Sequence, residues 1–486
     1  MSAGLLFLFV IIYFVILLGV AKVTGKNSNN MSFFIGNKNS NWMLVAFGMI
    51  GTSLSGVTFV SVPGAVGKDS FHYLQITIGY LIGYLAIAYV LLPIYYKMNL
   101  TSIYNYLETR LGFNAYKTGA SFFVLSRTLG ATARLYLVVK ILQVFILDSM
   151  GVPFGGTTLV ILAMILLYTY EGGVKTIVYT DTLQTSGMLL GLIICSIYIL
   201  SNMHFSVTDA FQAMQAKGIA TVFNTDVNSK TFFLKQIIGG AFVTLTMTGL
   251  DQEMMQKNIS VKSLKDAQKN MITIGISMVF VITLFLFLGG LLNLFAAQQI
   301  PPVTATGDTL FPTLALQHMP PYLSIIFILA LISALFPSAD GAITALTSSF
   351  CIDLLGMQRN KEWDEAKQKK IRQRVHLSFA FIFLLIVMVF KWIDNKSIID
   401  LILKVASYTY GPLLGLFAFG ILTKRKLYDK WVAFVCILAP LLCFLLETYQ
   451  KVLLGGFQIG QELLIINGFF TFLGLWLISS SNTEKK

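Results

Sequence analysis

The stretch ALFPSADGAITALTSSFCID, residues 334–353, holds three residue types that are rare in hydrocarbon. Pro337, Ser338 and Asp340 interrupt a run that is otherwise apolar and long enough to cross a membrane. A carboxylate at that depth is costly and is usually functional. Sodium is a hard cation that prefers carboxylate, hydroxyl and carbonyl oxygens. The stretch therefore indicates a site for a small cation.

A second intramembrane carboxylate, Asp181, lies a turn or two inside the apolar segment that begins with GGVKTIVYTDTLQ, residues 172–184. In residues 334–353, Pro337 cannot donate a hydrogen bond to the carbonyl four residues back. In that turn we expect the Ala334 carbonyl to face an ion, with the Ser338 hydroxyl beside it. For each aspartate the alternative is a protonated or backbone-bonded side chain that closes a helix kink.

Two other apolar segments are rich in glycine and hydroxyl residues: GMIGTSLSGVTFVSVPG, residues 48–64, and GGAFVTLTMTGLDQ, residues 239–252. Glycines allow the carbonyls around Gly51 and Leu54 to turn away from the helix axis. Backbone that leaves the helix at bilayer depth is tolerated only where it lines a cavity or is buried in protein. Each segment begins a set of five spans, so the pair predicts an inverted-repeat secondary transporter. The alternative is that small residues ease helix packing.

The composition shows an integral membrane protein. Of 486 residues, 56% are hydrophobic and 12% are charged, whereas soluble domains carry about 25% charged residues. The apolar runs predict an all-α polytopic chain, residues 1–486, with no appended soluble domain. We expect about 13 spans, at 4–22, 42–61, 72–96, 116–147, 155–170, 174–203, 232–256, 270–298, 321–353, 375–393, 397–423, 427–447 and 462–479.

The net charge of +13 does not indicate a nucleic-acid partner, because the basic residues follow the loops. With the N-terminus outside, the predicted cytoplasmic side holds 24 Lys and Arg, four of them in 257–269, and the outer side holds seven. This bias follows the positive-inside rule. It predicts a multi-pass protein of the plasma membrane with an outer N-terminus and a cytoplasmic C-terminus.

Basic residues inside the spans could bind an anion. Arg127 and Arg134 are seven residues apart and hence on one helix face, where a guanidinium can hold a carboxylate through two hydrogen bonds. Lys404 enters from another span. The alternatives are pairing of the arginines with intramembrane acids or helix carbonyls, and pairing of Lys404 with Asp400 four residues away.

Motifs of ATP-driven pumps and membrane hydrolases are absent from the sequence. It contains no G-x-x-x-x-G-K-[ST], H-E-x-x-H, C-x-x-C or G-x-S-x-G. We therefore predict that the chain is not an enzyme.

The motifs together resemble the sodium/solute symporter family, which includes bacterial sodium/galactose, sodium/proline and sodium/sialic-acid transporters. The resemblance is carried by residues 172–184 and 338–353, by DQEMMQKNISVKSLKDAQ (251–268) and by SYTYGPLLGLFAFGILTKR (407–425). It implies a 5+5 inverted repeat of the LeuT type. The leading helix would be 4–22, the repeats 42–203 and 232–423, and the two trailing helices would fall within 427–479.

The resemblance also implies the ion sites. The principal sodium site would use the carbonyls of Gly51, Leu54 and Ala334 and the hydroxyl of Ser338. This chain departs from the family in having Pro337 where a second hydroxyl is usual. A second site would use Asp181 with hydroxyls at positions that here hold Asp340 and Gly341, so Asp340 is a candidate replacement ligand. We expect one sodium ion and leave a second one open.

For the solute, the polar positions similar to those of the sialic-acid branch are Ser53, Ser55, Thr58 and Gln75. The galactose branch uses amide and aromatic residues where this chain has Thr58, Thr244 and Met247, which disfavours a galactose-type site. With Arg127, Arg134 and Lys404 as candidate cations, the prediction is a sugar acid or other organic anion.

The predicted function is sodium-coupled import of a small organic solute by alternating access. The alternatives are a neutral sugar or polyol as solute, and a proton-coupled or sodium-independent carrier in which Asp181 or Asp340 titrates. A transporter-like sensor is disfavoured. The expected partners are the solute and the lipid bilayer, without an obligatory protein partner.

Overall fold

The computed structural model describes residues 3–25, 33–34, 36–360, 362–393 and 398–480. Apart from loops and turns, the described chain is helical, with two short antiparallel strands, β1 (Lys426–Leu427) and β2 (Ser479–Ser480). Some of the predictions fall outside the described residues. These are five basic residues of the charge count, Lys26, Lys361, Lys396, Lys485 and Lys486. Ser397, the first residue of the expected span 397–423, also lies outside them.

The first part of the chain ends in the loop that precedes residue 233. Its helices are α1 (Ala3–Thr24), α3 (Trp42–Asp69), α4 (Tyr73–Ala86), α5 (Leu92–Lys97), α6 (Asn105–Arg110), α7 (Phe113–Leu142), α8 (Phe154–Asn202) and α9 (Val207–Ala216). The π-helical segment Ile87–Leu91 joins α4 to α5, and another, Gln143–Leu147, extends α7. Gly173 breaks α8 with φ 52° and ψ −147°, which confirms the expected boundary between spans at this point.

The second part repeats the alternation of long and interrupted helices. Its helices are α10 (Phe233–Thr244), α11 (Gln252–Ile259), α12 (Leu264–Gln298), α13 (Leu310–Thr313), α14 (Pro321–Ser349), α15 (Glu365–Ile393), α16 (Ile398–Thr409), α17 (Gly411–Leu422), α18 (Val432–Thr448), α19 (Gln450–Leu453) and α20 (Leu463–Leu477). The π-helical segment Leu245–Gly249 follows α10, and another, Phe350–Leu354, extends α14.

Helix length and composition indicate which helices can cross a membrane. Among the described residues, nine helices are long and apolar enough to cross a membrane, and two bent helix pairs raise this number to 11. Two further apolar helices, Phe154–Tyr170 and Leu463–Leu477, are shorter. The count of 13 therefore stays a prediction, and so do the bounds of the two repeats.

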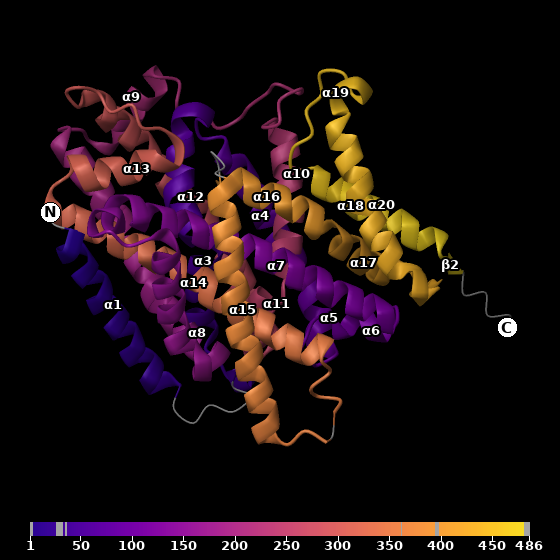
Figure 1. Cartoon of the computed structure of the whole chain (residues 1–486). Helices are drawn as coiled ribbons and strands as arrows, with labels where there is room; N and C mark the ends of the chain where they lie inside the picture. Colours follow the sequence, from indigo (N-terminus) through magenta and orange to yellow (C-terminus); the bar gives the residue numbers. More distant parts are fainter. Residues whose placement is uncertain (1–2, 26–32, 35, 361, 394–397, 481–486) are drawn as a thin grey trace.

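The helix α14 lies at the centre of the bundle and packs against α3, α7, α8 and α15. The most apolar stretch of α14 is 78% buried inside the protein, and so is that of α3. The peripheral helices are α1 on one side and α18 and α20 on the other (Figure 1). The two most buried spans are therefore those in which the sequence places glycines, hydroxyls and a proline.

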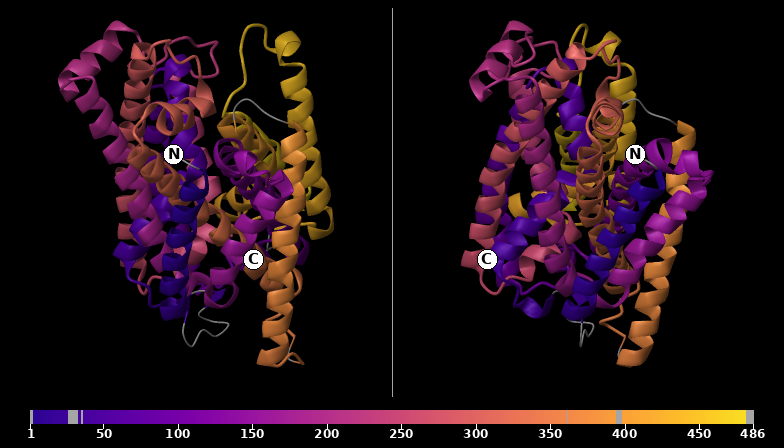
Figure 2. Two further views of the ribbon diagram at one scale, coloured as in Figure 1. Left: turned by 60° about the vertical axis from the view of Figure 1, so that its left-hand side comes forward. Right: turned by 90° about the vertical axis from the view of Figure 1, so that its left-hand side faces the viewer.

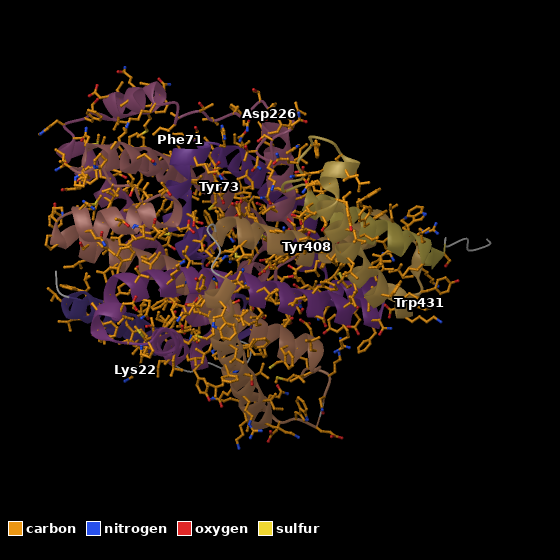
Figure 3. The ribbon with its side chains drawn as sticks, turned by 45° about the horizontal axis from the view of Figure 1, so that its top comes forward. Lys22, Phe71, Tyr73, Asp226, Tyr408 and Trp431 are labelled. Carbon is orange, nitrogen blue, oxygen red and sulfur yellow. The ribbon has the colours of Figure 1, made fainter. Side chains whose placement is uncertain are left out.

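The loops alternate between two ends of the bundle. The short helices α9 and α19 lie at one end, and α15 begins at the other (Figure 2). Phe71 and Asp226 lie near the end that carries α9, whereas Lys22 lies near the opposite end (Figure 3). Lys22 and the start of α15 thus lie at one end of the bundle, and α9 and α19 lie at the other.

Small residues allow α3 to lie directly against the second half of α8. A Cβ added at Gly48 would be 3.0 Å from Cβ of Asp181, and one added at Gly51 would overlap Oγ1 of Thr185. The close approach brings the backbone of α3 up to the polar side chains of α8. Gly130 on α7 is different, because nothing lies within 4 Å of a Cβ added there.

We predict that Gly51→Ala lowers the stability of the protein by about 1–3 kcal/mol, because overpacking forces neighbouring groups to move. Gly130→Ala is the matched control and should leave the stability unchanged or raise it slightly. Thermal unfolding of the purified variants in detergent measures both effects. Equal melting temperatures for the two variants would contradict the tight contact between α3 and α8.

Candidate functional site

The helix α3 is broken in its middle at Ser55, which has φ 55° and ψ 165° inside otherwise helical backbone. A positive φ is rare for a residue other than glycine and marks local strain. The break interrupts the ladder of backbone hydrogen bonds, so that peptide groups near Ser55 are available to other partners. The next residue, Gly56, faces α14, where its Cβ would lie 3.6 Å from Cα of Leu335. The break in α3 is therefore beside the turn of α14 that contains Pro337.

A second interruption separates α10 from α11, which are bent by 66° with respect to each other. Asp251 caps α11 and accepts hydrogen bonds from the backbone N–H groups of Glu253, at 2.9 Å, and Met254, at 3.2 Å. The helices α16 and α17 form another bent pair, at 44°. The interruptions expected in residues 48–64 and 239–252 are thus confirmed.

A cavity lies between the broken helices and is lined by α3, α4, α7, α10, α11, α12, α16 and the π-helical segment Leu245–Gly249. Hydroxyl groups are prominent in its wall and belong to Thr52, Ser53, Ser55, Thr58, Thr244, Thr248, Tyr73, Tyr80 and Tyr84. The remaining wall is mostly aliphatic side chains and methionine. Such a mixture of apolar surface and a few directed polar groups is typical of small-molecule sites.

Five of the seven predicted solute-binding residues line this cavity: Ser53, Ser55, Thr58, Arg127 and Arg134. Gln75 and Lys404 are not among its lining residues. The Gln75 amide donates to the carbonyls of His72 and Thr231, at 3.0 and 3.2 Å, and accepts from Asn224 N–H. Lys404 donates to Glu447 at 2.7 Å and is 57% exposed. In this conformation both side chains serve contacts away from the cavity.

The two arginines differ in their surroundings. Arg127 is buried, forms an ion pair with Glu253 and has Nη1 4.0 Å from Oδ2 of Asp251. Arg134, two turns further along α7, has no carboxylate within ion-pair distance among the described residues. Its guanidinium is therefore the one of the two that has positive charge left for a ligand in the cavity.

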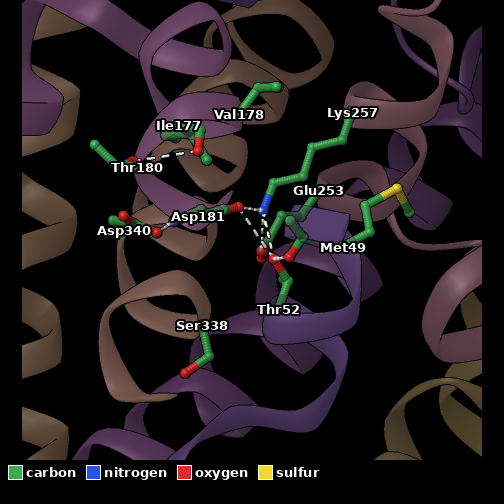
Figure 4. Close-up of polar contacts among 12 residues, drawn as sticks. Met49, Thr52, Ile177, Val178, Thr180, Asp181, Glu253, Lys257, Ser338 and Asp340 are labelled. Atoms are coloured by element: carbon green, nitrogen blue, oxygen red, sulfur yellow. Dashed lines mark hydrogen bonds and ion pairs between the residues drawn. The ribbon is translucent and has the colours of Figure 1, made fainter. Parts of the chain in front are cut away.

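A lysine occupies the neighbourhood of Asp181. Nζ of Lys257 donates to Oδ2 of Asp181 at 2.7 Å and to Oγ1 of Thr52 at 2.8 Å, and lies 3.6 Å from Oε1 of Glu253 (Figure 4). The charge count assigned Lys257 to a cytoplasmic loop, and this assignment is wrong. The apolar run ends there in sequence, but α11 bends back into the protein and buries the side chain to 3% exposure.

Asp340 is held differently from Asp181. Its Oδ2 accepts a hydrogen bond from the Tyr168 hydroxyl at 2.7 Å, and its Oδ1 accepts from the N–H of Gly341. Ser338, one half-turn earlier, donates to the carbonyl of Leu335 at 2.8 Å. The residues come from three helices, with Ser338 and Asp340 on α14, Asp181 on α8 and Thr52 on α3 (Figure 4).

The predicted sodium residues lie where α3, α8 and α14 meet. Leu54, Ala334 and Ser338 are buried to 1% exposure or less, and Gly51 is buried against Thr185. The Thr185 hydroxyl is itself buried without a hydrogen-bond partner. Within the described chain no three His, Cys, Asp or Glu residues are grouped as metal ligands. The predicted ligands at this point are thus carbonyl and hydroxyl oxygens together with the single carboxylates of Asp181 and Asp340.

Several residues of this region escaped the sequence analysis: Thr52, Tyr168, Thr185, Glu253 and Lys257. Thr185 follows Asp181 by four residues, which places it on the same helix face. Thr52 is adjacent to Gly51 in the glycine-rich segment. Glu253 and Lys257 belong to the motif of residues 251–268, but nothing in the motif shows that they point into the protein, because Glu253 is near the end of the expected span 232–256 and Lys257 follows it.

The charged groups form a connected chain. The Tyr410 hydroxyl donates to Asp251 at 2.6 Å. Asp251 lies beside Arg127, Arg127 pairs with Glu253, and Glu253 is also the neighbour of Lys257. These contacts connect the cavity wall on α7 with the polar region on α8.

The chain is similar to several proteins that are described as sodium-coupled transporters. Residues 33–429 match the model of the sodium:solute symporter family. The sodium/sialic acid symporter SiaT of Proteus mirabilis is 26% identical over 450 residues, which cover 86% of this chain and 85% of that protein. Sodium-coupled monocarboxylate transporter 1 of Mus musculus is 25% identical over 410 residues, which cover 82% of this chain and 65% of that protein.

A solved structure with the same fold is that of a sodium-coupled sialic acid symporter, described as substrate-bound and outward-open. It superimposes with a TM-score of 0.84 over 97% of each chain, at 18% sequence identity. This likeness confirms the all-α fold of the LeuT type.

We predict that Glu253→Gln lowers the stability by about 3–5 kcal/mol, because the buried guanidinium of Arg127 loses its ion-pair partner. Thermal unfolding in detergent measures the change. Glu447→Gln, which breaks the more exposed pair with Lys404, is the matched control and should cost less than about 1 kcal/mol. Similar losses in both variants would argue against a buried charge network around Glu253.

Proposed function

The chain belongs to the sodium:solute symporter family, and on this premise we propose that it imports a small organic anion of the sugar-acid class together with sodium. Alternating access between the two sides of a multi-pass membrane protein provides the mechanism. We further propose that the protein lies in the plasma membrane with its N-terminus outside and its C-terminus in the cytoplasm. The charge distribution of the loops supports this orientation.

The observation that carries the anion proposal is Arg134. Its guanidinium lines the cavity, and no acid among the described residues lies within ion-pair distance of it. A guanidinium can bind a carboxylate through two parallel hydrogen bonds. Arg127 lines the same cavity but is already paired with Glu253. We therefore assign the solute carboxylate to Arg134.

The hydroxyl groups of the cavity support a polyhydroxylated solute. Ser53, Thr58, Thr244 and Thr248 contribute side-chain hydroxyls, and the tyrosines of α4 add phenolic ones. A hydroxyl can both donate and accept, so such a wall suits sugar hydroxyls. A neutral sugar or polyol would use the same groups without Arg134 and is the second candidate solute.

We propose that sodium binds at the break in α3, to the carbonyls of Gly51 and Leu54, the carbonyl of Ala334 and the hydroxyl of Ser338. The support is that the broken backbone of α3 lies beside the turn of α14 in which Pro337 has no N–H to donate to the Ser333 carbonyl. An ion at this point would hold α3 against α14 and so stabilise the shape of the cavity. By linkage, sodium then raises the affinity for solute and solute raises the affinity for sodium by the same factor.

The driving force follows from the sodium gradient. Each sodium ion that moves inward down a membrane potential of about 100 mV contributes roughly 2.3 kcal/mol, and its concentration gradient adds to this. A monovalent anion that moves with it costs the same electrical energy, so that for one sodium per anion the concentration gradient is what remains. The solute can therefore be concentrated inside the cell without hydrolysis of ATP.

We predict that Arg134→Gln weakens solute binding by about ten- to a hundredfold, the loss expected for hydrogen bonds to a charged group. Arg134→Lys should recover part of the affinity. Gln75→Ala is the control away from the cavity and should bind the solute normally. Thermal-shift titration with sialic acid and other sugar acids, in saturating sodium, measures the affinities. An anion that binds equally to Arg134→Gln would exclude this assignment, and a neutral sugar that binds instead would favour the second candidate.

We predict that Ser338→Ala raises the sodium concentration for half-maximal uptake by on the order of tenfold, because one of the proposed ligands is removed. The maximal rate at saturating sodium should change less. Uptake into proteoliposomes, titrated with sodium at fixed pH, gives both quantities. Ser333→Ala, on the same helix and hydrogen-bonded to Tyr13, is the control. Uptake by the wild type without sodium would contradict the proposed coupling itself.

A further inference from the structure

We infer that the Lys257 ammonium is a tethered cation that fills the place of a second sodium ion, so that this chain binds and couples only one. The inference rests on the proposed sodium symport. It concerns the group of oxygens around Asp181, which is separate from the proposed sodium ligands near Ser338.

The ammonium group is surrounded by oxygens in the way that a small cation would be. An ammonium has three N–H donors, and three oxygens lie near Nζ, those of Asp181 at 2.7 Å, Thr52 at 2.8 Å and Glu253 at 3.6 Å. The side chains of Lys257, Asp181 and Glu253 are all 3% exposed or less. Sodium prefers the same carboxylate and hydroxyl oxygens, so the lysine and a second sodium ion would compete for one place.

The helix α14 leaves room for this arrangement at Gly341. A Cβ added there would overlap Oε1 of Glu253 and would lie 3.2 Å from Nζ of Lys257. Any larger residue at this position would therefore push the carboxylate and the ammonium away from α14. A hydroxyl-bearing side chain, which could coordinate an ion, is excluded by the same contact. The space that a side chain at position 341 would need is thus taken by Glu253 and Lys257.

The other nearby carboxylate has different partners. Asp340 accepts hydrogen bonds from the Tyr168 hydroxyl and from the N–H of Gly341. Its two oxygens are thereby held by donors of α8 and α14. Asp181 retains one oxygen, Oδ1, that is buried without a hydrogen-bond partner, although its Oδ2 receives the lysine. Removal of the ammonium would leave Asp181 without its cationic partner and Glu253 with Arg127 alone, and the space between Asp181, Thr52 and Glu253 would be open to a small cation.

The consequence for transport is a change in stoichiometry. An ammonium carries the same charge as sodium, but it remains attached to α11 and cannot cross the membrane. It therefore stabilises the carboxylates in every cycle without carrying any energy from the sodium gradient. With one ion per monovalent organic anion, the net charge moved is zero, and the accumulation at equilibrium depends on the sodium gradient alone.

The test counts bound sodium directly and needs no knowledge of the solute. Radioactive sodium is bound to the purified full-length protein in detergent at equilibrium. We expect one ion per wild-type chain and two per chain for Lys257→Ala, which vacates the oxygens of Asp181, Thr52 and Glu253. The double variant Lys257→Ala/Asp181→Asn removes the negative charge as well and should again bind one. Lys257→Arg, which keeps a cation, should also bind one.

The outcomes separate the two proposals. Two ions per wild-type chain would overturn the tethered cation and leave sodium symport intact, as would a folded Lys257→Ala protein that binds a single ion. No bound ion in the wild type would overturn the proposed sodium coupling. If Lys257→Ala elutes as an aggregate in size-exclusion chromatography, the wild-type and Lys257→Arg counts decide alone, and two ions in either overturn the inference.

Discussion

The fold depends on one constraint, the need to satisfy every backbone polar group inside a membrane. A continuous helix meets it without help, whereas a broken helix must find partners for its free N–H and carbonyl groups. Here the break of α3 at Ser55 lies in one of the two most buried spans, against α14 with its internal Pro337. Two weaknesses in helical hydrogen bonding thus face each other, and an ion between them would compensate both.

Buried charge follows the same logic. Asp181, Asp251 and Glu253 are compensated by Arg127 and Lys257 within one connected group. Such groups add little net stability compared with apolar packing, yet each member is required by the others. The group therefore fixes the relative positions of α7, α8 and α11 more than it strengthens the bundle. Arg134 stands outside it and keeps its charge for the cavity.

Much of the fold could be predicted because apolar length, loop charge and glycine-rich interruptions are local features of the sequence. The seven-residue spacing of Arg127 and Arg134 likewise brings both to the cavity. Which acid pairs with which arginine depends on residues far apart in the sequence. Spacing alone therefore cannot show that Glu253 forms an ion pair with Arg127 and that Arg134 has no such partner among the described residues. Lys257 was misplaced because a helix that bends back into the protein looks, in sequence, like a helix that has ended. Gln75 is polar and deeply buried, but its amide holds the backbone of the loop near Thr231.

The hydrogen bond from Tyr410 to Asp251 joins the two bent helix pairs. Tyr410 lies at the bend between α16 and α17, and Asp251 forms the cap at the bend between α10 and α11. Because α16 also forms part of the cavity wall, any tilt of this helix pulls on the cap of α11 and, through it, on the ion pair of Arg127. The two bends are thus connected by this one hydrogen bond. A closure of the cavity wall by α16 would also displace the cap of α11 and the charges beneath it.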